Sequence, residues 1–184
     1  MKKKSIFILL IVLLLVTVSI TLAYIVEQTS TNSVITFGSL KLELIETEII
    51  DGQEVRIKDG NAINITNTSN LNRQVKVKNV GNHPMFVRLS LKIESKSKEN
   101  NYNPMDFIDI PILDNWIYQD GFYYYQEVLK PGETTPPLMN EINFDNTNLI
   151  QYHRGDELEL KIKVGAVQSE HNNESVLEAV GWPE

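Results

Sequence analysis

The residues best suited to catalysis or metal binding are few and scattered along this chain of 184 residues. The three histidines are His83, His153 and His171, and none belongs to a His-Glu-x-x-His motif, which places two zinc ligands on one face of a helix. The lack of cysteine excludes thiol catalysis and cysteine-bound zinc or iron–sulfur clusters. We therefore expect exposed or capping histidines, no metal site and no cofactor.

The acidic motifs are equally unspecific. Asp106 and Asp109 could serve as paired carboxylates in acid–base chemistry, but the sequence offers no partner for them, and two solvent-facing acids are the simpler interpretation. The segment 145–148, Asp-Asn-Thr-Asn, is similar to the start of a calcium loop but lacks the glycine and the distal glutamate of an EF-hand. Gly-x-Ser-x-Gly, phosphate-loop and dinucleotide-binding motifs are also missing. We predict that the protein is not an enzyme.

The best candidate for a binding surface is an aromatic cluster. Its members are Trp116, Tyr118, Phe122, Tyr123, Tyr124 and Tyr125. Three consecutive tyrosines cannot all point inward on a strand, because successive side chains face opposite sides. At least one must face solvent or an edge, where it could stack on a sugar or an aromatic partner. Tyr123, Tyr124 and Tyr125 are therefore the candidate interaction surface, and packing within the core is the alternative.

Composition narrows the class of protein further. The formal net charge is −7 at pH 7, which makes the chain a poor general binder of nucleic acid, because such binding depends on basic residues that meet phosphates. Hydrophobic residues make up 42% of the chain and charged residues 22%. This balance is typical of a folded domain rather than a disordered chain.

The N-terminus predicts export. Three lysines precede the unbroken apolar run Ile6–Val16, and small residues follow, which is the layout of a signal peptide cut between Ala23 and Tyr24 by signal peptidase. The alternative is an uncleaved anchor through residues 6–26, because about 20 apolar residues span a bilayer. Both interpretations place residues 24–184 outside the cytoplasmic membrane, in the extracellular space or at the cell surface.

The rest of the chain has the periodicity of strands. Apolar and polar residues alternate over 40–44, 73–80, 85–93 and 157–168, as in strands with one buried face. In the last of these runs, Leu158, Leu160, Ile162 and Val164 face one way, and the length of the run suits a central strand.

Turn residues between these runs predict how the strands connect. Asp51-Gly52 indicates a small hairpin, and Asp120-Gly121 a type I′ hairpin between two aromatic runs. Gly81-Asn82 favours a hairpin or a tight antiparallel connection between the runs 73–80 and 85–93.

The expected architecture is all-β: an antiparallel, jelly-roll-like β-sandwich preceded by an N-terminal hydrophobic signal or anchor helix. No long segment after Val26 has a helical period, and Gly, Pro and Asn recur between short strands. We divide the chain into a signal peptide (1–23), a tether or donor segment (24–33) and a sandwich domain (34–184).

Several segments, taken in order, resemble the TasA and camelysin group of exported Gram-positive proteins, whose signal peptides are cut by the SipW type of signal peptidase. Each segment alone is unspecific, but their order is distinctive. They are Thr21–Tyr24 at the signal end, Asn32–Leu44, Val75–Leu89, Trp116–Tyr125, Leu129–Leu138, Val164–Gln168 and Ala179–Trp182.

The resemblance implies a jelly-roll sandwich at the cell surface or in the extracellular matrix of a Gram-positive bacterium. TasA-like members build biofilm fibres in which the N-terminal segment of one subunit completes the sheet of the next. Tyr24–Ser33 would then be the donor segment, with a disordered tether as the alternative. The expected partners are other copies of the chain or related matrix proteins.

Two further functions stay open. The chain could be a membrane-anchored, adhesin-like domain that uses its tyrosines to bind glycans or proteins. Camelysin members carry a metalloprotease label, so a secreted metalloprotease is the third possibility, although the sequence has no recognisable zinc motif. It would require bound metal and a role for His83, His153 or His171.

Overall fold

The structure of the protein, a computed structural model, describes residues 34–37, 40–57, 63–64, 70–96, 102–145 and 157–183. The predicted signal peptide (1–23), its cleavage point between Ala23 and Tyr24, and the segment 24–33 lie outside these ranges. Within the ranges, no helix is both long and apolar enough to cross a membrane.

The first sheet is built around β2 (Leu40–Ile50). One edge of β2 pairs with β1 (Val34–Phe37) and β3 (Gln53–Arg56), and the other edge with β6 (Arg73–Asn79), all antiparallel. Alternation along β6 buries every second side chain, including Val75 and Val77. The strand predictions for 40–44 and 73–80 are therefore confirmed.

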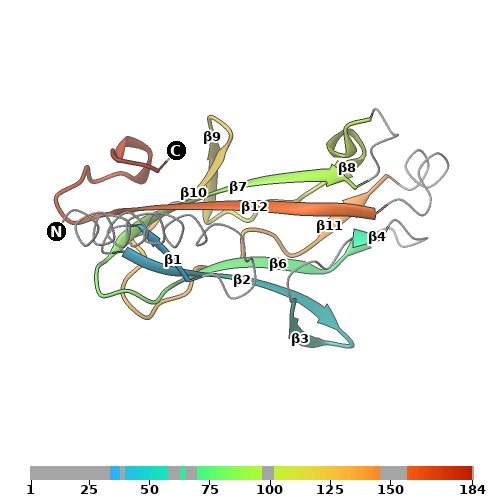
Figure 1. Ribbon diagram of the computed structural model, residues 1–184, viewed down its shortest axis with the longest axis horizontal. Helices are drawn as coiled ribbons and strands as arrows, with labels where there is room; N and C mark the ends of the chain where they lie inside the picture. The colour runs from blue at the N-terminus through green and yellow to red at the C-terminus, as the bar shows by residue number, and fades with distance from the viewer. Residues whose placement is uncertain are drawn as a thin grey trace, which may run out of the picture. The chain divides into compact units, whose positions relative to one another are not determined.

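The second sheet has five strands in the order β4-β12-β7-β10-β9. Their bounds are Ile63–Asn64 (β4), Glu157–Gln168 (β12), Met85–Ser95 (β7), Phe122–Tyr125 (β10) and Trp116–Gln119 (β9). Figure 1 shows β7 and β12 running side by side along the molecule, with β2 and β6 in the other layer. Their antiparallel register begins at Leu158 opposite Ser95 and ends at Gln168 opposite Met85.

Shorter elements complete the described fold. A small sheet joins β5 (Asn70–Leu71), β11 (Ile142–Phe144) and β8 (Ile108–Asp109), and two 3-10 turns are η1 (Pro104–Phe107) and η2 (Val176–Glu178). Strands dominate the described residues and almost all pair antiparallel, which confirms the all-β prediction.

The two large sheets share one hydrophobic core. Its fully buried side chains include Leu42 and Val77 from the first sheet and Leu89, Ile93 and Leu158 from the second. Burying one such leucine stabilises the fold by about 2 kcal/mol relative to its exposed state. The apolar face of each alternating run is thus the main source of stability.

The predicted hairpins at Asp51-Gly52 and Asp120-Gly121 are present. They join β2 to β3 and β9 to β10. Both residues of each turn have positive φ, namely 51° and 77° at the first and 51° and 86° at the second. This is the backbone that a type I′ turn requires, and it explains the Asp-Gly sequence at both positions.

Of the two connections predicted at Gly81-Asn82, a hairpin or a tight antiparallel connection, the hairpin is wrong. β6 pairs with β2, whereas β7 pairs with β12 and β10, so the connection crosses from one sheet to the other. The fully buried Asn79 holds this crossing: its Nδ2 donates to the carbonyl oxygens of His83 (2.8 Å) and Leu129 (2.9 Å), and its Oδ1 accepts from the Gly81 N–H (2.9 Å). These bonds fix the course of the backbone as it leaves the end of β6 and enters the second sheet at β7.

Candidate functional site

The aromatic cluster forms the hairpin β9–β10 at the edge of the second sheet. Trp116 lies opposite Tyr125, and Tyr118 lies opposite Tyr123. The ring centroids are 5.4 Å apart in the first pair and 4.9 Å apart in the second. The hairpin therefore carries two cross-strand aromatic pairs on one face, with the two rings of each pair in contact and tilted by 48° and 47°.

The inner pair belongs to the core and the outer pair reaches the surface. Trp116 is 5% exposed and Tyr125 is 7% exposed, whereas Tyr118 is 63% exposed. Tyr123, which lies opposite Tyr118, is half-buried. Burial raises the pKa of the Tyr123 phenol, with a smaller contribution from Tyr118, so Tyr123 stays neutral and able to donate a hydrogen bond.

Two of the three tyrosines proposed as an interaction surface are buried, which corrects that part of the prediction. Tyr125 faces the core, and Tyr124, on the opposite face, is 7% exposed because the C-terminal segment covers it. Tyr123 keeps partial access, and Tyr118 is the exposed aromatic that the prediction missed. The sequence contains the information needed to include Tyr118, because the Asp120-Gly121 turn places it directly opposite Tyr123.

This outer pair offers a surface on which a flat ring could stack. Tyr118 presents a phenol ring to solvent, and Tyr123 supports it from the neighbouring strand. Ile117, on the opposite face of β9, is 36% exposed. Such a surface suits stacking on a sugar ring or an aromatic side chain.

A second candidate is the outer edge of β12. β7 pairs with β12 from Leu158 to Gln168, but β4 pairs with it only at Glu157 and Leu158. From Glu159 onward, no other strand in the described part of the chain pairs with this edge. β12 therefore lies between β4 and β7 in the sheet order, and from Glu159 onward β7 is its one partner among the described strands. An unpaired edge is a site where a strand can be added.

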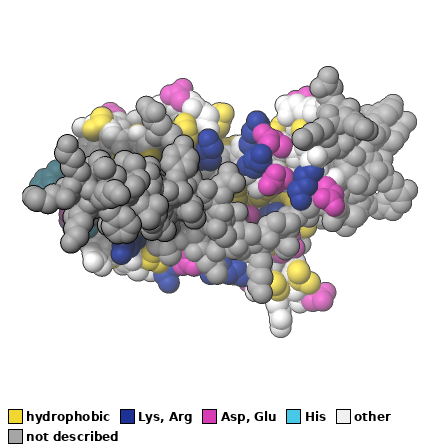
Figure 2. All heavy atoms as spheres, viewed as in Figure 1, with side chains coloured by type: hydrophobic (Ala, Val, Ile, Leu, Met, Phe, Trp, Pro, Cys, Tyr) yellow, Lys and Arg dark blue, Asp and Glu magenta, His cyan; other side chains and the backbone are white. Residues whose placement is uncertain are grey.

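The side chains along this edge alternate in character. Leu160, Ile162 and Val164 pack partly buried against the core, while Glu159, Lys161 and Lys163 are exposed. Figure 2 shows acidic and basic side chains intermingled on this face of the molecule. An added strand with one apolar face and one polar face would match this pattern.

Ion pairs tie the charged side of β12 to β7. Lys161 Nζ lies 2.6 Å from Glu94 Oε2, and Lys92 Nζ lies 2.5 Å from Glu94 Oε1. Hydrogen bonds from Lys161 and then Lys92 lower the pKa of Glu94 to about 2. The pair of Lys161 and Glu94 joins β12 to β7 and strengthens the ladder, whereas Lys92 and Glu94 both belong to β7.

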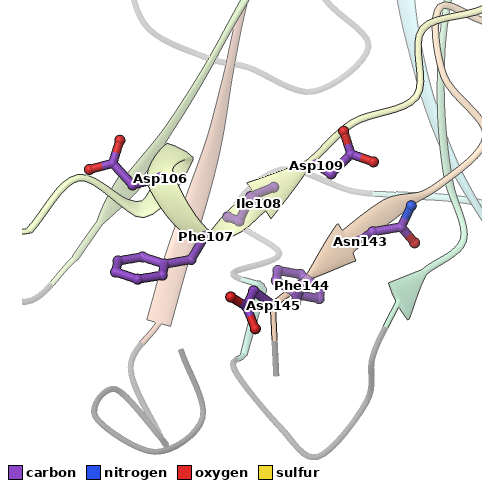
Figure 3. A pocket seen from close by; sticks show the side chains of 7 residues that line it. All are labelled: Asp106, Phe107, Ile108, Asp109, Asn143, Phe144 and Asp145. Carbon is purple, nitrogen blue, oxygen red and sulfur yellow. The ribbon is translucent and has the colours of Figure 1, made fainter. Parts of the chain in front are cut away.

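Asp106 and Asp109 help to line a hollow of about 350 Å³. Its other lining residues are Phe107, Ile108, Asn143, Phe144 and Asp145. Figure 3 shows the carboxylates of Asp106 and Asp109 pointing away from each other. They are not placed as a catalytic pair. No group of three or more His, Cys, Asp or Glu side chains in the described ranges could hold a metal ion.

The two described histidines lie in connections between elements. His83 sits between β6 and β7, with its Nδ1 3.8 Å from Glu170 Oε2. His171 is exposed in the turn after β12, and His153 lies outside the described residues, as do residues 146–148 of the calcium-like segment. Neither described histidine faces the hollow at Asp106 or belongs to the aromatic hairpin.

Comparison with known proteins adds no identification: no family model, curated protein or solved structure matches the chain.

Proposed function

We propose that the chain is an exported structural protein of the bacterial cell surface or biofilm matrix, with a jelly-roll sandwich that assembles by strand addition. The observation that carries this proposal is the open edge of β12, a long run of backbone without a second strand among the described residues. An edge of this kind is a template for pairing with another chain.

The proposed donor is Tyr24–Ser33 of a second copy, freed by cleavage between Ala23 and Tyr24. Its place immediately before β1 and its polar, irregular sequence support this assignment, because the donor in TasA-like proteins is the N-terminal segment. A donor from one copy that pairs with the sheet of the next gives a head-to-tail contact, which does not close and therefore propagates into filaments.

The direct test compares three purified chains: residues 24–184, residues 34–184, and residues 24–184 with 24–33 replaced by a Gly-Ser linker of equal length. Electron microscopy and sedimentation should find filaments only for the first chain, because the linker keeps the length but cannot complete a sheet. Filaments of all three, or of none at high protein concentration, would contradict the proposal.

Export is tested separately in the native host. Mass spectrometry of the mature protein should find Tyr24 at its N-terminus. An intact N-terminus in the membrane fraction, without filaments, would favour the second candidate function, a membrane-anchored adhesin-like domain. The observation in favour of that candidate is the 63% exposure of Tyr118 beside Tyr123.

A further inference from the structure

The outer aromatic pair of the β9–β10 hairpin combines close ring contact with access to solvent. Tyr118 and Tyr123 lie directly opposite each other on the two strands, and their ring centroids are 4.9 Å apart at a tilt of 47°. This separation lies within the range in which aromatic side chains are in contact. Tyr118 is more exposed than any other aromatic side chain among the described residues, so small reagents in solvent reach the pair.

Contact between two phenol rings permits an oxidative coupling. Each phenol gives up one electron and one proton to form a tyrosyl radical, and the two radicals join by a carbon–carbon bond between ring carbons ortho to the hydroxyls. Each of these carbons then passes its proton back to its own phenol oxygen. Two phenols and one molecule of hydrogen peroxide thus give one dityrosine and two molecules of water, with a haem peroxidase as the electron acceptor. Rings that the backbone holds in contact couple with each other before they meet another copy, because fixed geometry replaces a bimolecular encounter.

Other oxidisable side chains near the hairpin are poorer sites for this reaction. The chain has no cysteine, whose thiolate is readily oxidised. Trp116 and Tyr125 are buried in the core. The Arg88 guanidinium carbon lies 4.8 Å from the ring centroid of Trp182, and this positive charge opposes the loss of an electron from that ring. Oxidation at the hairpin is therefore directed to the outer pair.

We propose that Tyr118 and Tyr123 form an oxidative cross-linking site, at which a one-electron oxidant couples the two rings of one chain into a dityrosine. The new bond ties β9 to β10. β9 is the outermost strand of the second sheet, with β10 as its one partner among the described strands (Figure 1). The cross-link would therefore fasten this edge of the sheet in a protein without cysteine for a disulfide. This proposal does not depend on assembly through the edge of β12.

The test treats the purified full chain with hydrogen peroxide and a haem peroxidase, and compares the wild type with the Y123F and Y124F variants. Y123F keeps the ring but removes the phenol, so the tyrosyl radical cannot form there. Y124F is the matched control, because Tyr124 is buried on the opposite face of β10. We expect a monomeric product with dityrosine fluorescence from the wild type and from Y124F, and loss of that fluorescence from monomeric Y123F.

Peptide mapping locates the bond. A protease that cuts before aspartate separates Tyr118, in peptide 114–119, from Tyr123, in peptide 120–144. We expect the two peptides to be joined with the loss of two hydrogen atoms, and fragmentation in the mass spectrometer should place the bond on Tyr123. The joined peptides should also form from Y124F and should be missing from Y123F.

The Y118F variant keeps the test decisive if Y123F does not fold. Tyr118 is exposed, so Y118F leaves the core unchanged and should lose the joined peptides in the same way. The oxidation conditions are fixed beforehand as those that couple free N-acetyltyrosine. Under these conditions, the proposal is overturned if the wild type gives no joined peptides, if they occur only in covalent dimers, or if a folded Y123F or Y118F variant gives an equal yield.

Discussion

Asn79 shows how one polar side chain decides the path of the backbone. It is fully buried, and its amide satisfies the Gly81 N–H and the His83 carbonyl oxygen within the crossing between the sheets. Asn79→Ala would leave both groups without this partner, and each buried unpaired group costs about 1–3 kcal/mol. We predict a loss of about 3 kcal/mol in unfolding free energy, measured by urea denaturation. Exposed Asn82→Ala is the control and should change stability by less than about 0.5 kcal/mol.

Glu94 is the residue whose ionisation links stability to pH. Its pKa falls from the ordinary 4.5 to about 2 because Lys161 and Lys92 bind the carboxylate. A group with a lowered folded-state pKa stabilises the fold above its unfolded pKa, and that contribution is lost as pH falls toward the folded value. We predict that the melting temperature of the wild type falls between pH 4.5 and 2 by more than that of Glu94→Gln. Equal slopes for the two proteins would contradict this, and high salt should reduce the difference.

At the scale of strands, β12 has an end flanked on both sides and a longer stretch that pairs only with β7 among the described strands, and leucine substitutions can distinguish the two. Leu158 is fully buried, with β4 and β7 on its two sides, whereas Leu160 is half-buried in the stretch where β7 is the described partner. Leu158→Ala should destabilise the protein by about 3 kcal/mol through lost burial and a cavity. Leu160→Ala should cost less than half as much in the same denaturation experiment. A larger effect at Leu160 would mean that its side chain is fully enclosed.

Local sequence patterns were sufficient to predict the long strands and two of the hairpins. Alternation predicted β6, β7 and β12, and Asp120-Gly121 predicted the turn, because both depend on neighbouring residues only. The strand that pairs with β6 was not predictable in this way. Asn79 fixes the crossing to the other sheet partly by a hydrogen bond to the carbonyl oxygen of Leu129, which is fifty positions away in sequence.

The candidate surface was mispredicted for a similar reason. Alternation correctly places Tyr124 on the face opposite Tyr123 and Tyr125, but only the folded chain brings Trp182 and Ala179 over it.

For the whole molecule, assembly through β12 as proposed would be opposed by the exposed charges on that strand. Lys163 is exposed on this edge, and charged side chains, lysine above all, are a common means of discouraging edge-to-edge pairing. If the chain assembles through β12, Lys163→Val should shorten the lag before filaments form by several-fold, because the desolvation of an ammonium group no longer opposes pairing. Lys41→Val is the matched control, since Lys41 is also exposed but lies where β1 already pairs with β2. Light scattering at equal protein concentration measures both, and an equal shortening by the two variants would mean that added hydrophobicity alone drives assembly, without a special role for the β12 edge.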